Sequence, residues 1–274
     1  MLGTHALFVP QECHAAPTSE VSRWDNEVKK HPRDPEVYVR RARDLLILCE
    51  DDKALADLNM ALKLNPTHRG SLEERIILLG DMNRKEDALK DCATLIKSYP
   101  QSTDGLERRA IIYQSMKRLD DALKDLNAAV KLRPSSIRAW QYLCSIYINR
   151  GQTKEAVDCL TRLIELAPDN ATNYHVRANY YLKEKQYAKA AADLTHAVAL
   201  TPGEFEPLII RGDVYRQMKQ YPLAIKDYSR AIQLNKFRAG KAYAGRAECY
   251  KALGNNQAAE MDLKQGTIGE KVYR

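Results

Sequence analysis

Apolar residues recur along most of the chain at intervals of three and four, with polar residues between them. In residues 137–151 (IRAWQYLCSIYINRG) and 153–168 (TKEAVDCLTRLIELAP) this spacing places the apolar side chains on one face of a helix, and it does not fit the alternation of a strand. Gly151 and Pro168 close the two segments, because glycine favours a helix end and proline cannot continue a helix. The pattern predicts two short helices joined by a tight turn.

The helix pair recurs with a period of 34 residues. Six prolines mark the period: Pro32, Pro66, Pro100, Pro134, Pro168 and Pro202. With this proline as position 32, repeats begin at residues 35, 69, 103, 137, 171 and 205, and, after one inserted residue, at 240. Position 20 is alanine in the first six repeats, position 8 is mostly small, and positions 4, 11 and 24 are mostly large. Small residues facing large ones let paired helices approach closely, so seven stacked hairpins are predicted over residues 35–273.

A 34-residue period with this small and large pattern resembles the tetratricopeptide repeat family. The resemblance spans about residues 19 to 273. It implies an all-α fold, a right-handed superhelical α-solenoid of antiparallel helix hairpins, in which the first helix of each repeat lines a concave groove. The physical reason for stacking is that a single hairpin cannot bury its apolar face alone.

The two ends and one joint depart from the regular repeat. Residues 19–34 end in phase at Pro32 and predict an N-terminal capping half-repeat, and residues 1–18, which lack periodicity, predict a flexible tail. Lys236 stands where the next proline is due, so we expect the preceding helix to run further and Gly240 to absorb the inserted residue with an unusual backbone angle. The final hairpin would then pack at an altered angle. The segment GTIGEKVYR is short and glycine-broken for a capping helix, so we expect the chain to continue, or another surface or a second copy to cover this end.

A charged pair is repeated inside the hairpins. Position 7 is arginine and position 23 is aspartate in every repeat except the fourth, which has Leu143 and Cys159 instead. The pairs are Arg41/Asp57, Arg75/Asp91, Arg109/Asp125, Arg177/Asp193, Arg211/Asp227 and Arg246/Asp262. Both partners disappear together, which favours an ion pair within each hairpin, because a partly buried unpaired charge is costly. The alternative is that the arginines form a basic row for an acidic ligand.

Composition and candidate chemistry argue against catalysis. The net charge is +7, and the six cysteines form no C-x-x-C pair or zinc-binding spacing. The six histidines are scattered, and no nucleophile, base and orienting group share a register. No apolar run has the length of a membrane span. We therefore expect no enzyme activity, no cofactor and no metal, and the cysteine usage favours a reducing, cytoplasmic compartment.

The resemblance implies that positions 2, 5, 9 and 12 of each first helix face the groove. Amide and hydroxyl groups there can bond the backbone of an extended peptide while apolar neighbours take its side chains. The candidate groove residues are Arg43, Ile77, Ile111, Gln141, Ser145, Ile148, His175, Asn179, Leu182 and Arg216.

Some family members bind the acidic C-terminal tails of chaperones through a clamp of basic and amide side chains. The clamp positions of the first three repeats hold Val39/Arg43, Glu73/Ile77 and Glu107/Ile111, so the clamp is absent. Glu73 and Glu107 would repel a carboxylate, and binding of chaperone tails is therefore not expected.

The sequence favours a non-catalytic scaffold or adaptor that binds a peptide segment or partner protein in its groove. One alternative is a helper module of a larger co-chaperone or multidomain protein. Another is single-stranded nucleic-acid binding by the helical repeats. Acidic groove residues such as Asp213 and Glu248 argue against the last alternative.

Overall fold

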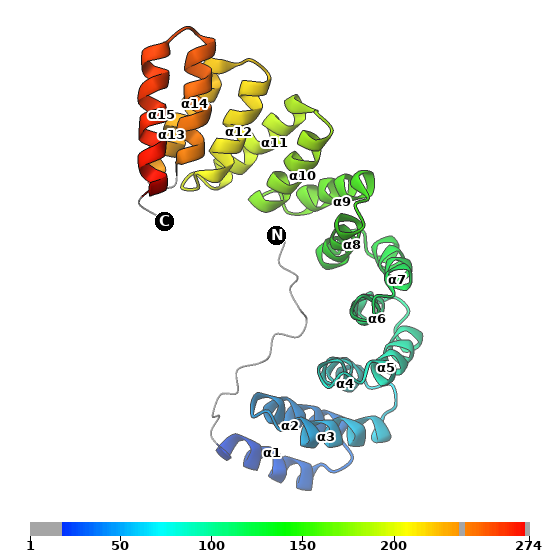
Figure 1. Cartoon of the computed structure of the whole chain (residues 1–274). Coiled ribbons are helices and arrows are strands. Elements are labelled where there is room, and N and C mark those ends of the chain that lie inside the picture. Colours follow the sequence, from blue (N-terminus) through cyan, green and yellow to red (C-terminus); the bar gives the residue numbers. More distant parts are fainter. Residues whose placement is uncertain (1–17, 236–238, 272–274) are drawn as a thin grey trace. The chain divides into compact units, whose positions relative to one another are not determined.

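The structure is a computed structural model that describes residues 18–235 and 239–271. Across these ranges the chain forms fifteen α-helices and no strand (Figure 1). The helices are α1 (Thr18–Lys30), α2 (Pro35–Ile47), α3 (Asp51–Leu64), α4 (Arg69–Asp81), α5 (Lys85–Ser98), α6 (Asp104–Ser115), α7 (Leu119–Leu132), α8 (Ile137–Asn149), α9 (Thr153–Leu166), α10 (Ala171–Lys183), α11 (Tyr187–Leu200), α12 (Glu206–Gln217), α13 (Tyr221–Leu234), α14 (Gly240–Ala252) and α15 (Asn256–Lys271). The even-numbered helices from α2 are the first helices of the hairpins, and the odd-numbered ones from α3 are the second.

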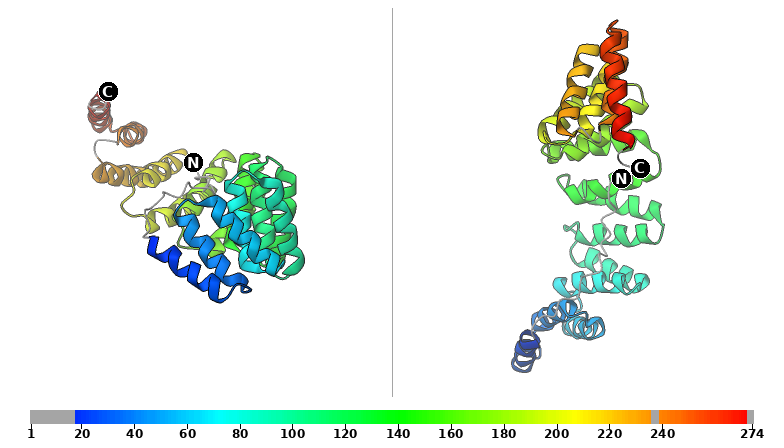
Figure 2. Two further views of the ribbon diagram at one scale, coloured as in Figure 1. Left: turned by 90° about the horizontal axis from the view of Figure 1, so that it is seen from below. Right: turned by 60° about the vertical axis from the view of Figure 1, so that its left-hand side comes forward.

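The helices pack into two compact units, an amino-terminal unit of residues 1–146 and a carboxy-terminal unit of residues 147–274. In the amino-terminal unit the hairpins α2–α3, α4–α5 and α6–α7 are stacked in chain order (Figures 1 and 2). The alanines at position 20 are 0% exposed in both units, so the close approach that the small residues predict is present within each stack. These residues are Ala54, Ala88, Ala122, Ala156, Ala190 and Ala224.

Each hairpin turns at a residue with a positive backbone φ angle, at position 15 of the repeat. These residues are Cys49, Asn83, Lys117, Gly151, Lys185, Lys219 and Gly254. The backbone N–H that follows each of them bonds back to a carbonyl in the first helix, as Gln186 does to Tyr181 at 2.8 Å. This 6→1 bond ends the first helix and starts the second. Only two of the seven positions carry the glycine that such a turn favours.

The joint before the seventh repeat differs from the expectation. Helix α13 has 14 residues, the same length as α3, α5, α7, α9 and α11, so the expected extension is wrong. Asn235 ends the helix with non-helical backbone angles (φ −149°, ψ 86°) and without a following proline. Gly240 begins α14 and is not among the residues of positive φ, so it does not absorb the insertion in that way. Lys236 itself lies outside the described residues.

The last second helix is longer than the others. Helix α15 has 16 residues and continues past Gly266 to Lys271. The glycines of the final segment therefore do not break the helix there. At Gly266 an added Cβ would lie 3.4 Å from the Tyr243 Cβ, so the helix passes close to the first helix of its own hairpin at this point.

Candidate binding surfaces on the first helices

The repeated arginine and aspartate residues form bidentate ion pairs inside their hairpins. Arg177 donates to both carboxylate oxygens of Asp193, from Nε at 2.8 Å and from Nη2 at 2.7 Å. Asp193 is 4% exposed, and its hydrogen bond to the guanidinium raises the pKa of Arg177. The same geometry occurs in Arg41–Asp57, Arg75–Asp91, Arg109–Asp125, Arg211–Asp227 and Arg246–Asp262. The arginines are thus engaged with buried carboxylates, which disfavours the alternative of a basic row for an acidic ligand.

Most of these arginines also reach the preceding helix pair, a contact that the sequence reasoning missed. Arg177 Nη1 donates to the Thr161 hydroxyl at 2.9 Å, and Arg75 Nη1 donates to the Asn59 side-chain oxygen at 2.7 Å. Equivalent bonds join Arg41 to Asp25, Arg211 to Thr195 and Arg246 to Ser229. The acceptors all occupy position 25, and that position is polar ahead of every position-7 arginine except Arg109, where it is Ala93. The arginine therefore fastens its own hairpin and also ties it to the previous one.

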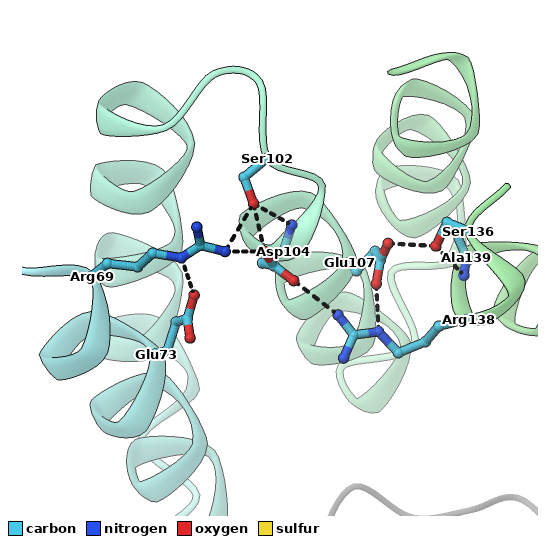
Figure 3. Close-up of polar contacts among 8 residues, drawn as sticks. All are labelled: Arg69, Glu73, Ser102, Asp104, Glu107, Ser136, Arg138 and Ala139. Atoms are coloured by element: carbon cyan, nitrogen blue, oxygen red, sulfur yellow. Dashed lines mark hydrogen bonds and ion pairs between the residues drawn. The ribbon is translucent and has the colours of Figure 1, made fainter. Parts of the chain in front are cut away.

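A second polar network joins the first helices α4, α6 and α8 in the amino-terminal unit (Figure 3). Glu107, on α6, is 2% exposed and accepts a hydrogen bond from Ser136 Oγ at 2.8 Å and one from Arg138 Nε. The expectation that Glu107 repels a carboxylate in an open groove is wrong, because its charge is buried and neutralised by Arg138 of the next repeat. Glu73 is likewise paired, with Arg69 Nε at 2.7 Å.

Asp104 is the centre of the same network. It lies between Arg69 of α4 and Arg138 of α8, and Arg138 Nη2 stands 3.3 Å from its carboxylate (Figure 3). Burial alone would raise the pKa of Asp104, but the hydrogen bond from Ser102 and the two guanidinium groups outweigh it, so this pKa lies below its usual value. Glu73, Asp104 and Glu107 therefore all have arginine partners within the chain.

The two basic groove candidates also have internal partners. Arg43 Nε donates to Glu74 Oε1 at 2.7 Å. Arg216 forms ion pairs with Glu248 and Asp213, and Asp213 in turn accepts a 2.7 Å hydrogen bond from the hydroxyl of Tyr228. The Tyr228 side chain is fully buried, and this burial raises the pKa of its hydroxyl. Both arginines therefore already form ion pairs within the chain.

The remaining candidates divide into accessible and buried residues. Gln141 is exposed, and Ser145, His175 and Asn179 are partly exposed. Nowhere in the described part of the chain do these four side chains have a hydrogen-bond partner. Ile77, Ile148 and Leu182 are partly buried, whereas Ile111 is 8% exposed and offers a ligand little surface, contrary to the expectation. Gln141 and Ser145 belong to the amino-terminal unit, and Ile148, His175, Asn179 and Leu182 belong to the carboxy-terminal unit.

In residues 18–235 and 239–271, no group of side chains is arranged as a catalytic or metal-binding site. No group of three or more His, Cys, Asp or Glu side chains there could hold a metal ion. Burial raises the pKa of the Cys92 and Cys144 thiols to about 12, so both stay protonated at neutral pH and are poor nucleophiles. None of the described helices is long and apolar enough to cross a membrane.

The stacked hairpins with small residues at their crossing points define a helical-repeat protein, a class that serves as scaffold for protein–protein interactions. Family models described as tetratricopeptide repeat match residues 74–137, 113–179, 171–204 and 206–237, which together make up more than half of the chain. The chain belongs to the tetratricopeptide repeat family. Among curated proteins, no sequence matches it.

Solved structures with similar folds include YrrB, described as a tetratricopeptide repeat protein with an unusual peptide-binding site. That alignment has a TM-score of 0.56 at 17% identity and covers 66% of this chain and 92% of YrrB. The protein MamA aligns with a TM-score of 0.55 at 20% identity over 62% of this chain and 92% of its own. A tetratricopeptide repeat protein from Parabacteroides merdae ATCC 43184 aligns with a TM-score of 0.53 at 16% identity over 85% and 92%. At these identities the likeness shows a shared fold.

Proposed function

We propose that the chain is a non-catalytic scaffold whose first helices bind an extended peptide segment of a partner protein. The proposal rests on a contrast between polar side chains that have a partner within the chain and polar side chains that have none. Glu73, Asp104 and Glu107 of α4 and α6 are engaged in internal ion pairs. By contrast, Gln141 and Ser145 in the amino-terminal unit, and His175 and Asn179 in the carboxy-terminal unit, have accessible donors and acceptors without a partner in the described residues.

The chemistry of these side chains suits a peptide backbone. Amide, hydroxyl and imidazole groups donate and accept hydrogen bonds without bringing a net charge, so they can pair with main-chain N–H and C=O groups of any sequence. Ile148 lies on α8 with Gln141 and Ser145, and Leu182 lies on α10 with His175 and Asn179. Both are partly buried and can receive apolar side chains of the peptide. The peptide-binding site named for YrrB is consistent with such a use of the fold.

The same features support a role without catalysis. The described residues bring no nucleophile next to a base, and Cys144 is protonated at neutral pH because of its burial. A family whose members are typically interaction scaffolds gives the same expectation. The four buried cysteines Cys92, Cys144, Cys159 and Cys249 are reduced, whereas Cys49 is disulfide-bonded, so a cytoplasmic location remains a hypothesis.

The test is a comparison of bound partners with and without two groove side chains. The tagged chain and the double variant His175→Ala/Asn179→Ala are used to capture proteins from the source cells, and the captured proteins are quantified by mass spectrometry. Lys226→Ala/Gln257→Ala, which truncates two exposed side chains on the second helices, is the matched control.

We expect a specific set of partners to be depleted with the groove variant and retained with the control. Peptide arrays built from those partners should then give binding to the wild-type chain that the groove variant lacks. If the same partners persist undiminished with the groove variant, the assignment of His175 and Asn179 is wrong. Thermal unfolding of both variants establishes that they remain folded.

A further inference from the structure

Four exposed lysines occupy the same place in successive second helices of the amino-terminal unit. Lys29, Lys63, Lys97 and Lys131 stand 34 residues apart and lie in the last turns of α1, α3, α5 and α7. Helices α3, α5 and α7 run along one side of the stack, and the first helices α4 and α6 form the other side (Figure 1). We call these four residues the lysine row. It lies on the helices that do not carry the candidate groove residues.

The helix dipole does not account for the row. A cation in the last turn of any helix is stabilised by the partial negative charge there, so the dipole should favour lysine in all second helices alike. The corresponding residues in the carboxy-terminal unit are Glu165, Ala199 and Gln233, on α9, α11 and α13, and these helices have no basic residue in the last turn. The row is therefore a property of one unit and not of the repeat.

The charges of the row are not balanced locally. Within the described ranges none of the four lysines forms an ion pair. The residues three positions earlier, at 26, 60, 94 and 128, include no carboxylate, and of those four positions earlier only Asp25 is one, which pairs with Arg41. Exposed apolar side chains lie beside the row instead: Met60 is 39% exposed, and Leu64 and Leu132 are each 37% exposed. Together they form a surface with both cationic and apolar contacts.

We propose that the lysine row binds an acidic segment of a partner protein. The cations complement a row of carboxylates, and Met60, Leu64 and Leu132 add contacts that apolar side chains of such a segment would fill. A single-stranded nucleic acid fits less well, because it requires aromatic platforms for its bases. The residues that flank the row at positions 26 and 30 include no aromatic side chain. This surface is separate from the proposed peptide groove and does not depend on it.

The test uses a fluorescein-labelled peptide of repeated Glu-Glu-Leu triplets and fluorescence anisotropy with the full chain. The variant Lys63→Glu/Lys97→Glu/Lys131→Glu should weaken binding by about tenfold or more, because it replaces attraction with like-charge repulsion. The control Lys154→Glu/Lys189→Glu/Lys226→Glu changes the net charge equally on exposed lysines of second helices in the carboxy-terminal unit and should change affinity by less than about twofold. A Lys-to-Gln triple at the row, which avoids placing anions at helix ends, should give an intermediate loss.

Three results would overturn the proposal. Undiminished peptide binding by the row variants, with their folds verified by circular dichroism, removes the row from the interface. An equal loss in the control triple assigns the binding to net charge alone. Tighter binding of a thymidine oligonucleotide that is lost with the same row variants assigns the surface to nucleic acid. The groove variant His175→Ala/Asn179→Ala should leave this peptide's affinity unchanged, which separates the two proposals.

Discussion

The ring of Tyr228 lies directly against the backbone of Gly245, where an added Cβ would stand 2.5 Å from the Tyr228 Cζ. Gly212 faces the same ring, with a corresponding distance of 2.8 Å to Cε1. Tyr228 is at position 24, which is leucine in most repeats, and its larger side chain is fully buried. The two glycines thus create the space that this tyrosine fills.

The variant Gly245→Ala should lower the free energy of unfolding by about 1 to 3 kcal/mol, the usual cost of overpacking a close-packed core. The ring cannot move away easily because its hydroxyl is bonded to Asp213. The measurement is the urea-unfolding midpoint by circular dichroism.

Tyr228→Leu provides the control for the overpacking. In Tyr228→Leu/Gly245→Ala the clash is gone, so adding the methyl group should cost much less than it does in the wild-type background. A methyl group that costs the same in both backgrounds would show that the contact is not the cause.

The variant Arg177→Leu should destabilise the chain by about 3 to 5 kcal/mol, because it leaves the buried Asp193 carboxylate without its cation. The double variant Arg177→Leu/Asp193→Cys copies the residues that the fourth repeat has at these positions and should recover much of the loss. The exposed ion pair of Arg162 and Glu165 is the matched control, and Arg162→Leu should cost at most about 1 kcal/mol. Equal effects of Arg177→Leu and Arg162→Leu in urea unfolding would contradict the buried-pair interpretation.

The repeat itself explains how much could be predicted from one sequence. When the seven repeats are aligned by position, Leu143 and Cys159 depart from the pattern together, and this joint departure predicted an interhelical Arg–Asp pair. The helices, their crossing points and the hairpin lengths followed from the same period, because each residue type is constrained by the same packing in every copy.

Features that break the repeat were beyond the sequence reasoning. Glu107 is buried because Arg138 of the next repeat pairs with it, and arginine occurs at position 2 in that repeat alone. The hydrogen bond from Arg177 to Thr161 was not predicted, because polar residues are common on helix surfaces and a threonine there does not indicate a particular partner. The expected extension of α13 was wrong because a helix can end without a proline, and the non-helical backbone of Asn235 ends this one.

The turn residue Lys185 has a φ angle of 55°, in the left-handed region that glycine adopts without cost. Lys185→Gly should therefore raise the free energy of unfolding by about 0.5 to 1 kcal/mol, because it relieves the strain of a side chain at positive φ. The matched control is Lys189→Gly, four residues later inside α11, which should lower stability by about 1 kcal/mol. Thermal unfolding distinguishes the two, and a loss of stability in both would mean that the turn does not need the left-handed conformation.

Asp104 should give part of the stability of the amino-terminal unit a dependence on acid pH. Its pKa in the folded chain is lowered, so its contribution is complete above the unfolded value of about 3.9 and is lost as the pH falls through the folded value. The melting temperatures of the wild type and Asp104→Asn should therefore differ most near neutral pH and converge below about pH 4. Asp158→Asn removes an exposed carboxylate of α9 that has no ion pair in the described residues, and its difference from the wild type should stay small at every pH. A constant difference for Asp104→Asn across the titration would show that the network stabilises the helices through packing and not through the ionised carboxylate.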